Sequence, residues 1–182
     1  TITCSGDYRI HTFTGPGTFC VSCVGNAAGS NTVDYLVVAG GGGGAGGYQA
    51  GGGGAGGYRE SPGTASGSYT VSPLGASPAV ALPVAVSPYP VTVGSGGAAS
   101  TTQACRGSNG SSSSFSGTST ITSAGGGGGG SGKTCSPVPV SYFRWPGADG
   151  GSGGGASGYQ SPAATGTVGI GNTPPVSPSQ GN

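Results

Sequence analysis

Three copies of one glycine-rich motif place the strongest constraint on how this chain can fold. The copies read GGGAGGYQ at 42–49, GGGAGGYR at 52–59 and GGGASGYQ at 153–160. In each copy the alanine and the tyrosine are three residues apart, and a threefold extended helix of the polyproline II type would place both on one edge. Because glycine has no side chain to bury, these tracts predict a structure held together by backbone contacts rather than by a conventional apolar core.

Two structures are open to such tracts. Threefold glycine helices can lie side by side at short spacing, since no side chain separates them, and can hydrogen-bond to one another. Glycine loses more backbone entropy on folding than any other residue, so flexible linkers are the alternative. The repeated placement of tyrosine favours packed helices, because a pure Gly/Ser linker has no reason to carry phased aromatic residues.

Composition excludes several classes of protein. The chain has 45 Gly and 14 Pro in 182 residues, and only 5% charged residues, where an ordinary domain has roughly 25%. A formal net charge of +1 gives neither the basic surface of a nucleic-acid binder nor the high charge typical of disorder. The glycines do not recur at every third position as collagen requires, and no apolar stretch approaches the roughly 18 residues of a membrane span.

Short strand signals separate the glycine tracts. Residues 8–24 alternate apolar with polar residues around Gly15-Pro16-Gly17, which is the pattern of a β-hairpin. Residues 33–39 are apolar and rich in β-branched side chains, which predicts a buried strand. Further strands are predicted at 89–93, 119–123, 138–145 and 165–170. No segment has the apolar spacing of a helix without Gly or Pro inside it.

We therefore predict an all-β fold: a small, jelly-roll-like β-sandwich with long glycine tracts that pack as polyglycine II helices, and essentially no α-helix. Residues 1–182 are predicted to form one domain. Its parts are an N-terminal hairpin and strand at 1–39, glycine repeats at 40–71, a semi-rigid Pro-rich connection at 72–90, and strands alternating with Gly/Ser-rich tracts at 91–182. Asn109-Gly110 is a strong turn signal.

Motifs that suggest catalysis lack the neighbouring sequence that catalysis requires. Gly127 to Thr134 matches the phosphate-loop pattern, but Pro137 and Pro139 forbid the helix that must follow. The single histidine, His11, has no nucleophile elbow to accompany it. Isolated carboxylates give no support for hydrolysis. We predict a protein that is not an enzyme, with no catalytic residue and no cofactor.

The five cysteines leave several roles open. Cys20 and Cys23 are spaced as half a zinc site, but no second such pair exists, so no metal site is predicted. Structural disulfides are expected if the chain lives outside the reducing cytosol, and one thiol then remains for a free or inter-chain role. Small buried apolar residues are the alternative.

Aromatic residues offer the most credible binding chemistry, because Tyr and Trp contribute large amphipathic contact areas at low entropic cost. They form a sugar- or protein-binding surface, or they fill the few apolar gaps of a thin fold. The candidates are Tyr48, Tyr58, Tyr159, Tyr142, Phe143, Arg144 and Trp145. Asn109 begins an Asn-Gly-Ser sequon and is a candidate glycosylation site.

The order of motifs resembles a known family. HTFTGPGTF at 11–19, DYLVVAGGGGG at 34–44 and YPVTVGSGG at 89–97 are similar to the glycine-rich domain of bacteriophage tail-fibre and minor tail proteins. The resemblance covers nearly the whole chain, although the five cysteines and the Pro-rich 72–90 segment depart from it. It implies a non-enzymatic, extracellular virion component that contacts the host surface through loops and exposed aromatic residues. Some phage adhesins use packed polyglycine helices for specificity.

The expected partners follow from the resemblance and the thin core. They are other copies of the chain, with a trimer preferred, other virion proteins, and a glycan or protein of the host surface. Neither nucleic acid nor membrane insertion is expected. The alternative from a different class is a subunit of a non-phage extracellular filament or surface layer that assembles by strand pairing.

Overall fold

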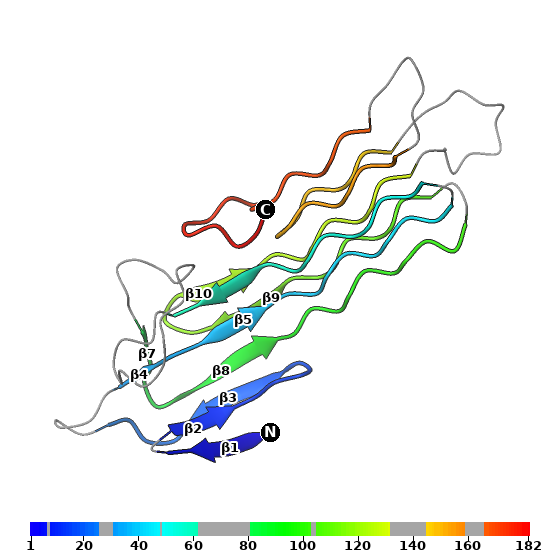
Figure 1. Ribbon diagram of the computed structural model, residues 1–182. Helices are drawn as coiled ribbons and strands as arrows, with labels where there is room; N and C mark the ends of the chain where they lie inside the picture. Colours follow the sequence, from blue (N-terminus) through cyan, green and yellow to red (C-terminus); the bar gives the residue numbers. More distant parts are fainter. Residues whose placement is uncertain are drawn as a thin grey trace.

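The chain forms a small set of β-sheets from which a bundle of extended glycine-rich runs projects (Figure 1). The computed structural model describes residues 1–6, 8–25, 31–47, 49–61, 81–102, 105–131, 145–158 and 166–182. The strands are β1 Ile2–Ser5, β2 Tyr8–His11, β3 Gly17–Val21, β4 Thr32–Val33, β5 Leu36–Val38, β6 Tyr58–Glu60, β7 Leu82–Pro83, β8 Ser87–Thr92, β9 Ser113–Ser116 and β10 Thr120–Ser123. These described residues contain no helix, so the predicted all-β fold is confirmed.

Two sheets form a small sandwich. The larger has four antiparallel strands in the order β10-β9-β8-β3, and the smaller pairs β5 with β6. Strand β5 contacts β9 and β10 across the layers, and β6 also contacts β10. Two further two-stranded sheets, β1-β2 and β4-β7, complete the strand pairings of the described residues.

The side-chain core lies between these layers and is small. Val37 of β5 packs with Tyr89 of β8 and Phe115 of β9, and Leu82 and Val84 complete the buried cluster. The rings of Tyr89 and Phe115 are 6.0 Å apart, within the favourable range for aromatic pairs. The Tyr89 hydroxyl bonds to the backbone of Ala85 at both N and O, which satisfies its polar end.

Several predicted strands are confirmed and others are corrected. Strands β8 and β10 match the predictions at 89–93 and 119–123. The hairpin predicted for 8–24 is wrong in its pairing, because β2 pairs with β1 through a tight turn at Gly6 (φ 56°), and β3 pairs with β8. A turn residue with positive φ explains why glycine stands at that position.

The remaining strand predictions also differ from the structure. The strand predicted at 33–39 is divided into β4 and β5, with Leu36 and Val38 exposed and Val37 buried. Residues 166–170 form no strand, and most of the predicted strand at 138–145 lies outside the described residues. Of the Pro-rich segment, 81–90 contains β7 and most of β8, and 72–80 lies outside the described residues.

The glycine tracts form extended runs that continue out of the sheets (Figure 1). Strand β5 leads into run 1, run 2 leads into β6, β8 leads into run 3, run 4 leads into β9, and β10 leads into run 5. Adjacent runs hydrogen-bond through their backbones. The runs are run 1 (39–46), run 2 (51–57), run 3 (94–100), run 4 (105–111), run 5 (124–131), run 6 (145–151), run 7 (152–158) and run 8 (166–170).

The hydrogen bonds between runs repeat every three residues, which is the signature of threefold helices. In run 1, the N–H groups of residues 39, 42 and 45 donate to run 2, and those of residues 40, 43 and 46 donate to run 4. A threefold helix presents successive residues on three edges, so each edge can serve a different neighbour. The predicted packing of polyglycine II helices is therefore confirmed, and a flexible linker does not describe these tracts.

Run 5 lies at the centre of the bundle. Its backbone hydrogen-bonds to runs 1, 2, 4, 6 and 7. The residues from Gly126 to Ser131 are buried, although they have almost no side chains. A Cβ at Gly129 would lie 2.0 Å from the carbonyl oxygen of Gly51, and one at Gly127 would lie 1.8 Å from that of Ala148. Close approach of the backbones therefore requires glycine at these positions.

Gly129→Ala is expected to lower the free energy of unfolding by about 3 kcal/mol or more, because the added methyl group meets backbone that cannot move aside. Gly52→Ala is the matched control, since a Cβ at Gly52 meets no atom within 4 Å. The free energy of unfolding of that variant should rise by about 0.4–1 kcal/mol, because alanine reduces the entropy of the unfolded chain. Urea unfolding followed by circular dichroism measures both, and equal effects would contradict the close-packed arrangement.

Candidate functional site

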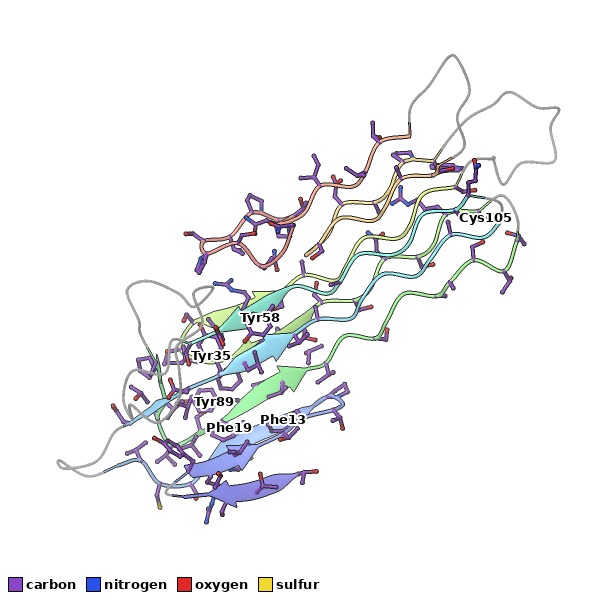
Figure 2. All side chains as sticks on the ribbon, in the orientation of Figure 1. Phe13, Phe19, Tyr35, Tyr58, Tyr89 and Cys105 are labelled. Carbon is purple, nitrogen blue, oxygen red and sulfur yellow. The ribbon has the colours of Figure 1, made fainter. Side chains whose placement is uncertain are left out.

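Runs 1, 3, 5 and 7 end, and runs 2, 4, 6 and 8 begin, at the end of the bundle that is remote from the sheets, here called the far end. Gly46 N donates to Cys105 O at 3.2 Å, which joins the end of run 1 to the start of run 4. Trp145 N donates to Ser131 O at 3.0 Å, which joins run 6 to run 5. Figure 2 shows Cys105 at this end, opposite the labelled aromatic side chains of the sandwich. The far end is therefore formed by the described ends of several neighbouring runs.

The far end also holds the described neighbours of most predicted binding residues. Tyr48 and Tyr159 lie outside the described residues, but Gly158 N donates to Gln49 O at 2.8 Å, so residues adjacent to both tyrosines are in contact. Trp145 begins run 6 at this end, and 46% of its surface is exposed. Tyr142, Phe143 and Arg144 directly precede it in sequence and lie outside the described residues.

Tyr58 does not belong to this group. It lies in β6, at the sheet end of the bundle, where its hydroxyl donates to Glu60 Oε2 at 2.6 Å. Figure 2 shows it beside the sandwich. The three motif copies look equivalent in sequence, but run 2 is antiparallel to run 1, so the second copy carries its tyrosine in the opposite direction. Similar motifs thus end at opposite ends of the molecule.

A disulfide at the far end was not assigned from the sequence. Cys105 is disulfide-bonded, whereas Cys4, Cys20 and Cys23 are free and exposed. Cys135 lies outside the described residues. The expectation of small buried apolar cysteines is therefore wrong for the three free thiols. The odd number of cysteines was the available signal, and it could not identify which of them is bonded.

Asn109 has a structural role in the bundle. Its Oδ1 accepts a hydrogen bond from Gly128 N at 2.9 Å, and its Nδ2 donates to Asp149 O at 3.4 Å. The side-chain amide thereby satisfies a donor of buried run 5. Asn109 and Gly110 lie within extended run 4, so the turn predicted at this dipeptide is wrong. The hydrogen bonds that run 4 makes with its neighbours outweigh the preference of Asn-Gly for a turn.

The phosphate-loop pattern and His11, to which the sequence assigns no catalytic role, contribute to packing and hydrogen bonding. Gly127 N donates to Ser152 O at 2.9 Å inside the bundle, so this amide is already hydrogen-bonded to a neighbouring run. The His11 ring packs edge-on against Phe19 at 5.0 Å. Among the described residues, no three His, Cys, Asp or Glu side chains come close enough to hold a metal ion. Nor does the described part of the chain contain a long apolar helix capable of spanning a bilayer.

A polar cluster stabilises the junction between β5 and β6. Ser61 is 2% exposed; its hydroxyl donates to Asp34 Oδ1 at 2.8 Å and accepts from Tyr35 N at 3.0 Å. Burial raises the pKa of Tyr35, and the nearby positive charge of Arg59 partly opposes that rise. Neutral Tyr35 is therefore favoured in the folded chain relative to the unfolded one.

The chain belongs to the glycine-rich domain family, whose model matches residues 14–181. The β1-β2 sheet precedes the match, and strands β3 to β10 all lie within it. No curated protein and no solved structure gives a match to this sequence. The family assignment confirms the glycine-rich character of the resemblance noted above.

Asn109→Ala is expected to destabilise the chain by about 1–3 kcal/mol, because it leaves the buried Gly128 N–H without its acceptor. Asn109→Asp retains an acceptor and should lose less. Thermal unfolding measured by calorimetry on both variants checks this order, and an alanine variant as stable as the wild type would contradict the role of the amide.

Tyr35 should make the protein less stable in alkali. The unfolded chain releases the Tyr35 proton near its ordinary pKa of about 10, below the raised pKa of the folded state. Between those two values the unfolded state binds fewer protons, so stability falls as pH rises. Urea unfolding from about pH 8 to about pH 11 should show a smaller fall for Tyr35→Phe, and an unchanged fall would contradict the assignment.

Proposed function

We propose that the chain is a non-enzymatic structural and adhesive component of a phage tail fibre or similar virion appendage, which contacts the host cell surface through its far end. The supporting observation is that all eight runs begin or end there, on a bundle whose backbone is hydrogen-bonded in three directions. Binding segments are commonly placed on loops that a rigid scaffold positions. The exposed Trp145 lies at the same end.

The chemistry of the far end suits a host glycan or protein. Trp145 is a large amphipathic side chain with little conformational entropy to lose, and Arg106 follows disulfide-bonded Cys105 in run 4. Tyr48, Tyr159, Tyr142, Phe143 and Arg144 are proposed to join this surface through their described neighbours. Tyr58 is not part of the proposal, because it lies at the sheet end.

An extracellular location accords with the disulfide at Cys105, since disulfides persist mainly in oxidising environments. Self-association is also part of the proposal, with a trimer preferred, because the side-chain core is small for a chain of this length. Other proteins of the appendage are the remaining proposed partners.

A second candidate function is a subunit of a non-phage filament or surface layer. The β1-β2 sheet favours it, because β1 is exposed along its whole length and, among the described residues, pairs with β2 alone. Edges of this kind can pair with a strand of another chain. Electron microscopy with gold-labelled antibodies against the chain separates the two functions: label on tail fibres supports the first, and label along free filaments supports the second.

Trp145→Ala is expected to weaken binding to host cells about 10-fold or more, as expected for a central aromatic contact. The measurement is the binding curve of fluorescently labelled protein on cells that the source particle infects. Tyr8→Ala is the matched control, since Tyr8 is 41% exposed but lies in β2, outside the far end. Equal binding by both variants and the wild type would contradict the proposed contact surface.

A further inference from the structure

Residues 171–182, here called the closing segment, lie at the sheet-side end of runs 6 and 7, where runs 1 to 5 adjoin strands. Runs 1 to 5 each continue into a strand of the sheets, whereas runs 6 and 7 meet each other in a bend at residues 150–152. The closing segment folds back beside that bend, close to β10 (Figure 1). Within the described chain, this is where the strandless runs are joined to the sheets.

Backbone hydrogen bonds hold the closing segment on the bend. Asn172 N donates to Gly151 O, and Thr173 N donates to Gly150 O, both at 2.9 Å. Gly153 N donates to Asn182 O, also at 2.9 Å. Residues 150–153 therefore both donate to and accept from the closing segment, much as one run does with its neighbour.

Gln180 makes the most specific contact of the segment. Its side chain is buried, with Oε1 accepting from Ala124 N at 2.7 Å and Nε2 donating to Pro174 O at 2.8 Å. Its backbone oxygen accepts from Tyr58 N at 2.9 Å. The side-chain amide thus acts as an additional peptide group at the point where run 5 begins and run 2 ends.

Apolar packing contributes little to the segment. Val176 is half-buried. The exposed residues of the segment are Pro174, Pro175, Ser177, Ser179 and Asn182. Segments with few buried apolar contacts open at lower free energy than the body of a domain. The closing segment is therefore held mainly by a small set of hydrogen bonds, with the Gln180 amide as the buried one.

We propose that the closing segment is an exchangeable docking peptide, that its dock is the backbone of Tyr58, Ala124 and residues 150–153, and that Gln180 determines its specificity. The partner is a second copy of this chain, whose closing segment takes the same dock. Exchange of an identical element between copies is a low-cost route to association, because every contact is already made within one copy. This inference is independent of the proposed role in a fibre.

The first test is hydrogen exchange of the full-length Gln180→Ala variant, read at individual amides. The N–H groups of Ala124 and Tyr58 should exchange about 10- to 100-fold faster than in the wild type, while those of Gly126 and Gly129 in run 5 keep their protection. Ser179→Ala is the control, because this exposed neighbour bonds to Gly181 within the segment. Unchanged exchange at Ala124 and Tyr58, or an equal acceleration at Gly126 and Gly129, would overturn the proposal.

The second test supplies the segment in trans. A synthetic peptide of residues 171–182 is added to the full-length Gln180→Ala variant at about millimolar concentration, which matches the effective concentration of a tethered segment. The wild-type peptide should restore protection at Ala124 and Tyr58, whereas a peptide carrying Gln180→Ala should not. Failure of the wild-type peptide to restore protection, or equal action of both peptides, would overturn exchange through Gln180.

Discussion

Hydrogen bonding between backbones that approach without intervening side chains is the interaction on which the rest of this structure depends. Each interior N–H or C=O that leaves water must find a partner, and the threefold geometry of the runs supplies one on every edge. A Cβ added to any glycine from Gly125 to Gly130 of run 5 would lie within 2.5 Å of a backbone atom of a neighbouring run. Substitution of these central glycines is therefore expected to destabilise the bundle, even though they have no side chains.

The sandwich and the bundle depend on each other in a definite way. Short strands such as β5 and β10 align the chain by conventional pairing and side-chain packing, and the glycine runs extend that alignment beyond the core. The direction of each strand determines the direction of its run. The apolar cluster around Val37, Tyr89 and Phe115 thus sets the register for a far larger array that contains almost no apolar side chains.

Much of the fold could be predicted from local sequence. The glycine motifs indicated threefold packing, and β-branched or aromatic residues indicated β8 and β10. The partner of each strand could not be predicted, because β3 pairs with β8, which is distant in sequence, rather than with neighbouring β2. The turn predicted at Asn109-Gly110 is wrong because the local turn preference of this dipeptide is weaker than the hydrogen bonds of run 4.

The positions of the candidate binding residues could not be predicted from the sequence. The sequence offered no means to separate the position of Tyr58 from that of Trp145, because the alternation of run directions is a property of the assembled bundle. The role of Gln180 was equally invisible. A single glutamine among prolines and serines gives no local sign that its amide will complete a hydrogen-bonding array built by residues far away in sequence.

The far end has a consequence for how such a chain can change over evolution. Loop-closure entropy rises slowly with length, by only about 0.6 kcal/mol for each doubling, so connections between runs can lengthen at small cost to stability. The glycines of run 5, in contrast, cannot gain a side chain unless a neighbouring backbone moves. Variation is thereby directed to one end while the framework stays constant, and a lineage can alter what this end touches without having to solve the folding problem again.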